Sequence, residues 1–440
     1  MVSSSRPNTI KESLARLHHL LYPSSEKTEM VIDDNGATTT TREEMPPTIQ
    51  QEIWYVGCAM DILSELQCGQ PLVAKNKMGQ VLVKVDATNA AMKDTIDTGF
   101  VTIQVRVSRL SRETRPLKFQ ILPRHCVNVL LCLVAGVCRK CHECEKAHRY
   151  LVEGLGIVRG LVDIPDKVDA LVGLQALKWM QEIKLYLLRH AAECSILLGH
   201  YEDATKHLMA LTHELASRPS PPLSQRAALN LSWGMLHTAT GNSEKASMHL
   251  AAAMQLSSDD PTLENDVGTL AKAALTLLWA SDNQEKQDLA DGFRQDLAAR
   301  ATTSDASPYE KMISSLVQSI HYTNPHHVGF QKAKAFLLEA IRQTDAIGMR
   351  TFTATALALL GQLFVSTEPE QAEKMIARSF KLYQKNGKTM NETTSTCALT
   401  LSDLHSARGD TEQSQKYKKE YEKHLKATAE SIELAQQLME

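Results

Sequence analysis

One stretch decides the fold: residues 233–253 read WGMLHTATGNSEKASMHLAAA. Gly234 and Ala246 are small residues on either side of a short break that contains Gly241. Small residues at these positions let two antiparallel helices approach closely, and Leu250, one helical turn after Ala246, fills the groove between them. The stretch therefore predicts two packed helices that are joined by a tight turn.

The same pattern of small and large residues recurs along the chain from Pro123 onward. The small residue of each second helix is Ala147, Ala204, Ala246, Ala333, Ala372 and Ser414, at intervals of 57, 42, 87, 39 and 42 residues. The interval of 87 residues is long enough to contain one further, degenerate unit at 283–297. Recurrence at this period is typical of tetratricopeptide (TPR) units, and it predicts an all-α fold, an α-solenoid of TPR-like antiparallel helix pairs.

The structural positions of these units follow from the alignment of the repeats. They are Ala147, Leu151, Gly199, Ala204, Leu208, Gly234, Gly241, Ala246, Leu250, Ala333, Leu337, Gly361, Ala372 and Ile376. Trp179, Trp233 and Trp279 lie on apolar faces of the expected helices, and we interpret them as core residues.

The composition agrees with a helical chain that does not carry out bond chemistry. Among 440 residues, 43% are hydrophobic, only 20 are glycine and 5% are aromatic, which disfavours turn-rich β-sandwiches and glycine-loop nucleotide folds. The formal net charge of -3 excludes a surface that is basic throughout. No phosphate-loop, dinucleotide, zinc-protease or nucleophile-elbow motif occurs, so we expect a protein that is not an enzyme and has no cofactor.

The N-terminal quarter differs from the repeats. We expect a short helix and a disordered linker over residues 1–48, because the stretch from Tyr22 to Thr48 is rich in Ser, Thr and Pro. Residues 49–118 are expected to form a helix and a β-like insert, since VLVKV at 81–85 and FVTIQVRV at 100–107 alternate with period two. The TPR-like superhelical domain is expected over residues 119–440.

The start of the chain shows no secretory signal, and its longest apolar run, 127–138, is shorter than the ~20 residues that a membrane span needs. We therefore expect no membrane contact. The nine cysteines are expected to be reduced thiols, because their number is odd and no export signal is present.

One cluster of residues has the spacing of metal ligands: Cys138, Cys141 and Cys144, followed by His148. A closed thiolate cage needs an irregular loop, whereas Ala147 places this segment at the tight turn of a helix pair. We therefore favour packing over a metal site at these residues.

A basic run precedes the repeats. It comprises Arg106, Arg109, Arg112, Arg115, Lys118 and Arg124, with only Glu113 opposing them. Such a run could contact phosphates, but no aromatic residue lies between Arg106 and Arg115 to stack on bases. We interpret the run as a solvated basic loop and expect no direct DNA contact.

Several stretches of the repeats resemble one family, the TPR subunit of the cohesin loader (the Scc-four or Mau-two family). Phe119-Gln-Ile-Leu-Pro-Arg124 resembles the family's entry into a TPR helix, and 187–200 resembles its L-L-E-H…G-H segment. Residues 331–337 and 358–364 are similar to a pair of segments near the family's C-terminus. The resemblance covers about three quarters of the chain, from Phe119 to its end. Family members carry further TPR units before this stretch, so the chain resembles a shortened form, and the section 81–107 resembles nothing in the family.

The resemblance implies a non-enzymatic scaffold subunit of the cohesin loading complex. Such a subunit binds the extended N-terminal segment of the HEAT-repeat loader subunit, and it promotes association of cohesin with chromatin for sister-chromatid cohesion. The implied location is the nucleus, in association with chromatin, with a cytoplasmic pool. Two alternatives stay open: a generic TPR adaptor for a chaperone, motor or ubiquitin-ligase complex, which the solenoid alone fits equally well, and an enzyme that uses the cysteine cluster.

Overall fold

The computed structural model describes residues 47–91, 100–106, 114–120, 123–160, 170–258, 266–280, 283–304, 306–323, 329–387 and 392–439. These residues divide into two compact units, which we describe separately. The expected N-terminal helix and all of the expected linker before Pro47 lie outside the described residues. None of the described helices combines the length and the apolar character that crossing a membrane requires.

The first unit contains the described residues up to Cys138 and the segment Glu153–Lys184. Its elements are α2 (Pro47–Gln67), α3 (Pro71–Ala91), β1 (Phe100–Arg106), β2 (Thr114–Gln120), most of α4 (Arg124–Arg139), the end of α5 (Cys144–Gly160) and the start of α6 (Ala170–Leu198). Helices α2 and α3 pack together, and Lys77 of α3 pairs with Asp61 at 2.7 Å and with Glu65 at 2.9 Å.

The expected strand at 81–85 is wrong, because these residues belong to helix α3. Ala74, Met78, Val81 and Val85 of α3 are buried and their spacing follows one helical face, while Val83 between them is 70% exposed. The β-branched residues therefore lie on a helix. An alternation over only five positions is compatible with a helix as well as with a strand, so it was too short to decide between them.

Residues 100–106 do form a strand, and its partner is residues 114–120. Strands β1 and β2 are antiparallel, with Phe100 opposite Gln120 and Arg106 opposite Thr114. The β-like section is therefore a hairpin of two strands within an otherwise helical set of described residues.

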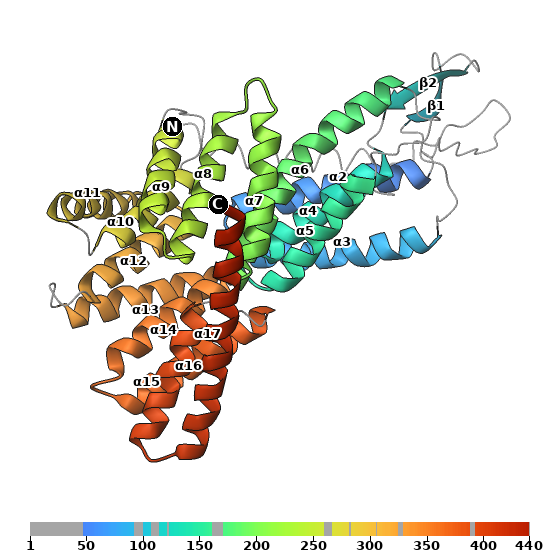
Figure 1. The fold of residues 1–440 in the computed structure, drawn as a ribbon. Coiled ribbons are helices and arrows are strands. Elements are labelled where there is room, and N and C mark those ends of the chain that lie inside the picture. Colours follow the sequence, from blue (N-terminus) through green and yellow to red (C-terminus); the bar gives the residue numbers. More distant parts are fainter. Residues whose placement is uncertain are drawn as a thin grey trace. The chain divides into compact units, whose positions relative to one another are not determined.

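The second unit contains Arg139–Val152 and Leu185–Glu440. Its complete helices are α7 (Tyr201–Ala216), α8 (Leu223–Ala239), α9 (Ser243–Ser258), α10 (Asp266–Trp279), α11 (Gln284–Ala301), α12 (Pro308–Thr323), α13 (Phe330–Ile347), α14 (Arg350–Phe364), α15 (Pro369–Gly387), α16 (Glu392–Ala407) and α17 (Thr411–Met439). Consecutive helices pair as α8 with α9, α10 with α11, α12 with α13, α14 with α15 and α16 with α17 (Figure 1). The α-solenoid of TPR-like pairs is confirmed, and α10 with α11 is the degenerate unit expected in the 87-residue interval.

The turn between α8 and α9 shows how the chain reverses within one unit. Gly241 has a φ of +77°, a left-handed conformation that costs glycine little. The N–H of Asn242 donates to the carbonyl of His237 at 2.9 Å, which satisfies one of the last carbonyls of α8. The side chain of Asn242 accepts from the N–H of Lys245 at 3.1 Å and so caps α9.

The core runs from one pair to the next. One buried cluster joins α8 to α11 through Leu231, Leu250, Leu275 and Ala290. A second joins α13 to α16 and includes Leu337, Ile376 and Leu401. No pair buries its apolar face alone, so each depends on its neighbours for stability, as expected of stacked repeats.

Candidate partner-binding scaffold

The glycines of the repeats allow close helix contacts. A Cβ atom added to Gly234 would lie 2.7 Å from the side chain of Leu250 on α9. At Gly361 of α14, an added Cβ would lie 2.5 Å from the side chain of Ile376 on α15. The small and large residues that the repeat alignment pairs therefore contact each other across two different units.

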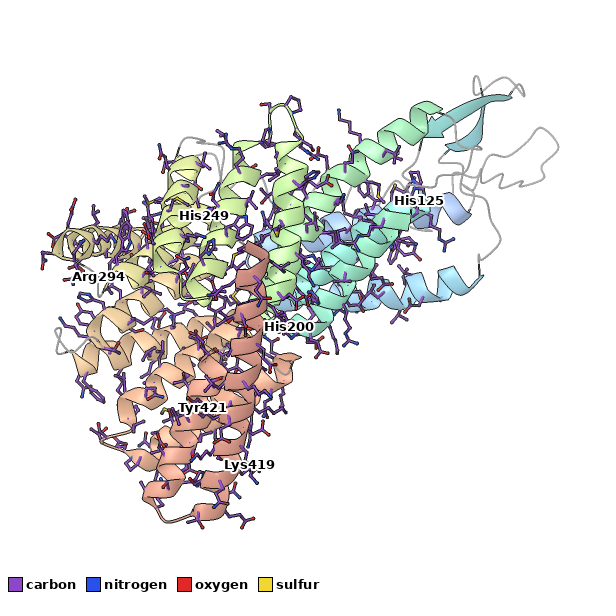
Figure 2. All side chains as sticks on the ribbon, viewed as in Figure 1. His125, His200, His249, Arg294, Lys419 and Tyr421 are labelled. Carbon is purple, nitrogen blue, oxygen red and sulfur yellow. The ribbon has the colours of Figure 1, made fainter. Side chains whose placement is uncertain are left out.

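The other structural positions follow the same arrangement. Ala147, Leu151, Gly199, Ala204, Leu208, Gly234, Ala246, Leu250, Ala333, Leu337, Gly361, Ala372 and Ile376 are all buried, and only Gly241, in its turn, is exposed. Figure 2 shows side chains filling the spaces between neighbouring ribbons.

The tryptophans are less uniform than expected. Trp279 is buried, and its indole N–H donates to the hydroxyl of Ser247 at 2.8 Å. Trp233 is half-buried and donates to Thr212 of α7 at 3.1 Å, and Trp179 is also half-buried. Two of the three therefore lie at the margin of the core.

A set of hydrogen bonds joins distant parts of the second unit, and we call it the turn bridge. The N–H of Cys144, at the start of α5, donates to Oδ1 of Asn386 on α15 at 3.0 Å. Nδ2 of Asn386 donates to the hydroxyl of Thr351 on α14 at 2.7 Å, and this hydroxyl donates to the carbonyl of Cys141 at 3.4 Å. The α4–α5 turn is therefore fixed to helices more than 200 residues later in the chain.

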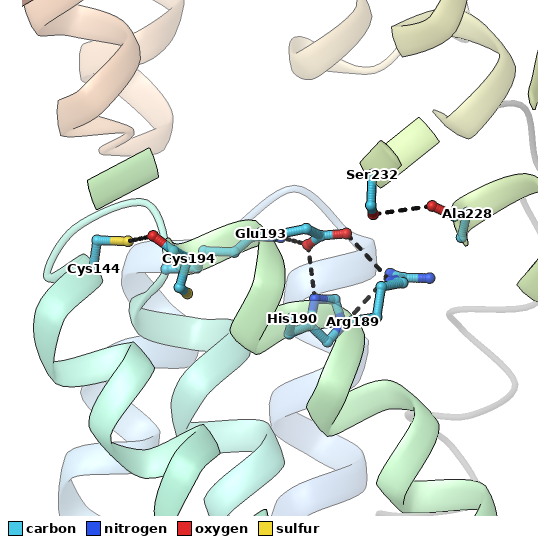
Figure 3. Close-up of polar contacts among 8 residues, drawn as sticks. Cys144, Arg189, His190, Glu193, Cys194, Ala228 and Ser232 are labelled. Atoms are coloured by element: carbon cyan, nitrogen blue, oxygen red, sulfur yellow. Dashed lines mark hydrogen bonds and ion pairs between the residues drawn. The ribbon is translucent and has the colours of Figure 1, made fainter. Parts of the chain in front are cut away.

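A partly buried ion cluster adjoins this turn through Lys140, and Figure 3 labels its other members, Glu193, His190 and Arg189. Glu193 of α6 accepts from Lys140 at 2.5 Å and contacts Nδ1 of His190 at 2.9 Å, and Nε of Arg189 lies 3.3 Å from its other oxygen. Burial alone would raise the pKa of Glu193, but the charge of Lys140 and the nearby His190 and Arg189 hold it well below its usual value. Burial, assisted by the charge of Arg189, lowers the pKa of His190 to about 4, so this imidazole is neutral at pH 7.

The predicted metal ligands have other partners. Cys144 contacts the carbonyl of Cys194 through its sulfur at 3.6 Å (Figure 3), and His148 contacts the hydroxyl of Ser195 at 3.1 Å. Burial raises the pKa of the Cys141 thiol, which keeps it protonated. Cys138 is buried near the end of α4, in the other unit. Within the described ranges, no group of three or more His, Cys, Asp or Glu side chains could hold a metal ion.

The basic run is divided between several elements. Arg106 ends β1, Arg115 and Lys118 belong to β2, and Arg124 begins α4. Arg109 and Arg112 lie outside the described residues. That the basic run is a solvated loop therefore stays a prediction.

Sequence reasoning did not find the turn bridge or the ion cluster. No local spacing marks Asn386 or Thr351, because their partners are far away in the sequence. The sequence contains the charges of the ion cluster, Lys140 in the α4–α5 turn and Glu193 on α6. No spacing in the sequence indicates that these two side chains form an ion pair.

These observations define a class of protein: a helical-repeat protein whose consecutive helix pairs pack against their neighbours. The sequence model of the cohesin loading factor family matches residues 13–411, and the chain belongs to this family.

Individual relatives agree with the family match. The chain is 24% identical over 275 residues to the MAU2 chromatid cohesion factor homolog of Nematostella vectensis, a match that covers 61% of this chain and 41% of the relative. It is 22% identical over 248 residues to the homolog of Drosophila mojavensis, covering 55% of this chain and 36% of the relative. The matches thus span less than half the length of these relatives.

Solved structures of helical proteins are also similar. The apo form of the quorum sensor NprR from B. thuringiensis superposes with a TM-score of 0.42 and 10% identity, covering 85% of this chain and 99% of that one. A Rap protein complexed with competence and sporulation factor gives a TM-score of 0.43 and 8% identity, covering 86% and 99%.

Proposed function

We propose that the chain is a non-enzymatic scaffold subunit of the cohesin loading complex. It binds the HEAT-repeat loader subunit through an extended N-terminal segment of that partner, and it promotes association of cohesin with chromatin for sister-chromatid cohesion. Its place of action is the nucleus, in association with chromatin. The observation that carries the proposal is the family match over residues 13–411, which includes the helix pairs from α8 with α9 to α14 with α15.

The physical properties of the stack suit this role. Repeated helix pairs present a long surface, and such surfaces recognise extended peptides. The turn bridge links the start of α5 to α14 and α15, and the ion cluster links the α4–α5 turn to Glu193 of α6. A scaffold that is rigid before binding loses less conformational entropy when a partner docks, which favours affinity.

The proposal is tested by affinity purification of the tagged full-length chain from nuclear extract, followed by mass spectrometry. We expect recovery of a large HEAT-repeat protein together with cohesin subunits, and neither with the tag alone. Recovery of chaperone, motor or ubiquitin-ligase components in their place would instead support a generic TPR adaptor. A sample that contains none of these proteins would contradict the scaffold proposal itself.

The chromatin step needs a separate measurement. We expect depletion of the chain to reduce the cohesin in the chromatin fraction while total cohesin stays constant. Unchanged chromatin-bound cohesin would contradict the proposal that the chain promotes association of cohesin with chromatin. The interaction with the loader subunit is tested separately, by the purification.

A further inference from the structure

A small cavity of about 180 Å³, open to solvent on one side, lies within the second unit. It is located between the α8–α9 turn and the last turn of α17, and it is lined by His237, Thr240, Asn242, Lys245, Gln436 and Met439. A water molecule occupies about 30 Å³ of the liquid, so the cavity has room for several waters or for one small polyatomic group.

His237 is the unusual member of this lining. Its side chain is only 4% exposed, yet its Nδ1 is buried without a hydrogen-bond partner in the described part of the chain. The imidazole stacks on His249 of α9, with ring centroids 5.4 Å apart and an angle of 15° between the planes, and on Trp233 at 5.7 Å; His249 is labelled in Figure 2. The stack orients the ring, and its Nδ1 has an unused hydrogen-bonding position.

The rest of the lining is rich in hydrogen-bond donors. Lys245 is exposed, and among the described residues its ammonium group forms no ion pair. The side-chain oxygen of Asn242 is used by the N–H of Lys245, which leaves its amide N–H groups for another acceptor. Gln436 offers a second amide. No carboxylate is among the six lining residues, so the described part of the lining offers donors and one positive charge.

The electrostatics of His237 agree with this description. Burial, with the nearby His249 and the charge of Lys245, lowers the pKa of His237 to about 4. The ring is therefore neutral at pH 7 and carries one N–H donor. A negative group in the cavity would offset the positive potential that Lys245 imposes.

We propose that this cavity binds a small oxyanion, a carboxylate or a phosphate group. Lys245 supplies the charge, Asn242 and Gln436 supply amide donors, and His237 supplies a ring N–H. Charge-assisted hydrogen bonds of this kind are stronger than bonds between neutral groups. The oxyanion is either a free ion or the acidic group of a peptide side chain, and the inference is independent of the loader partner.

The first test titrates the full-length chain with inorganic phosphate and with acetate at constant ionic strength, by calorimetry. We expect saturable binding of at least one anion with a Kd of about 1 mM. Lys245→Gln is expected to weaken it about tenfold, because it removes the charge from an exposed position without changing the fold. Lys416→Gln removes an exposed charge at the start of α17 and is expected to bind like the wild type. Absence of saturation, or equal binding by Lys245→Gln and wild type, would overturn the proposal.

A second variant tests the imidazole. His237→Phe keeps a stacked aromatic ring but removes both ring nitrogens, and we expect weaker binding of the same anion with an unchanged melting temperature. If that variant unfolds, ¹⁵N spectra of the wild-type histidines give the same information, because the bound anion must shift the ring nitrogens of His237. Unshifted resonances at saturating anion would contradict its place in the site.

The source of the oxyanion is decided by peptides. A short peptide with one glutamate is compared with the same peptide carrying glutamine and with free acetate, and a phosphoserine peptide is compared with inorganic phosphate. Tighter binding of a peptide than of its free ion assigns the cavity to an acidic side chain. Equal affinity assigns it to the free ion. Each result supports one source of the oxyanion, provided that Lys245→Gln weakens the binding.

Discussion

Asn386 of α15 accepts a hydrogen bond from the backbone N–H of Cys144, a residue 242 positions earlier in the chain. A helix usually satisfies its first N–H groups with a side chain just before it, whereas α5 takes this partner from another repeat. The amide of Asn386 is 2% exposed and also donates to Thr351, so one side chain joins three helices.

We therefore expect Asn386→Ala to destabilise the second unit by about 2–3 kcal/mol, because it leaves the buried N–H of Cys144 without its partner and removes a hydrogen bond to the half-buried hydroxyl of Thr351. The melting temperature should fall. Hydrogen exchange should become faster at residues 141–148, the segment that the amide holds.

Gln284→Ala is the matched control for this change. It removes an amide that is exposed and bonds only to Asp288 within its own helix, so its effect on stability is expected to be small. If Asn386→Ala behaved like the control in both measurements, the turn bridge would have no energetic role.

A pair of glycine substitutions tests the packing of the repeats. In Gly234→Ala, the new Cβ would lie 2.7 Å from Leu250, and we expect a loss of about 1–3 kcal/mol because one helix must shift. Gly292→Ala on α11 meets no atom within 4 Å, and it is expected to stabilise the chain by up to about 1 kcal/mol through helix propensity. Chemical denaturation measures both; a stabilising Gly234→Ala would disprove the close contact.

The success of the repeat prediction has a local physical cause. Gly234, Ala246 and Leu250 are close in sequence, and their packing is dictated by helical geometry that any reader of the sequence can apply. The strand predicted at 81–85 failed because five alternating residues also fit a helix when Ala74 and Met78 extend the pattern.

The bridge and the cavity could not be predicted in the same way. Asn386 and Cys144 are brought together by the sum of all the rotations between successive helix pairs, which no local pattern encodes. The cavity likewise needs the end of α17 beside His237, although the two are about 200 residues apart. The sequence therefore indicates the unit of the fold, while contacts between distant units require the structure.

The ion cluster predicts how stability depends on pH. The unfolded His190 has a pKa of 6.5 and the folded one about 4, so acid protonates the unfolded chain first. Because the pKa is lowered in the fold, the contribution of His190 to the free energy of unfolding is fully present above pH 6.5. It decreases as the pH falls toward 4. Between pH 7.5 and pH 5 we expect the free energy of unfolding to fall by about 2 kcal/mol through this residue.

Other groups titrate too, so the measurement is a difference between variants. His190→Gln can still donate to Glu193 but cannot take up a proton. Between pH 7.5 and pH 5, the unfolding free energy of this variant is expected to decrease less than that of the wild type. The difference between the two decreases should be about 2 kcal/mol. The exposed His213 serves for comparison as His213→Gln. Parallel curves for wild type and His190→Gln would show that His190 is not held neutral in the fold.

The last prediction connects packing with the proposed function. Ala246 is fully buried where α9 meets α8, so Ala246→Glu forces a larger side chain and an unpaired carboxylate into the contact. Overpacking and the buried charge together are expected to cost about 3–5 kcal/mol. Because the core continues from α8 to α11, the damage spreads to the next helix pair and distorts the surface that the stack presents.

We therefore expect Ala246→Glu in the full-length chain to lose co-purification with the HEAT-repeat loader subunit and with chromatin-bound cohesin. Met248→Glu introduces the same charge on the same helix at a side chain that is 60% exposed, and it is expected to retain both. Circular dichroism verifies that helices persist in each variant, so that the loss reflects the stack and not global unfolding. Equal recovery from wild type, Ala246→Glu and Met248→Glu would mean that this part of the solenoid is not the platform for the partner, because a distorted α8–α9 contact would then leave binding untouched.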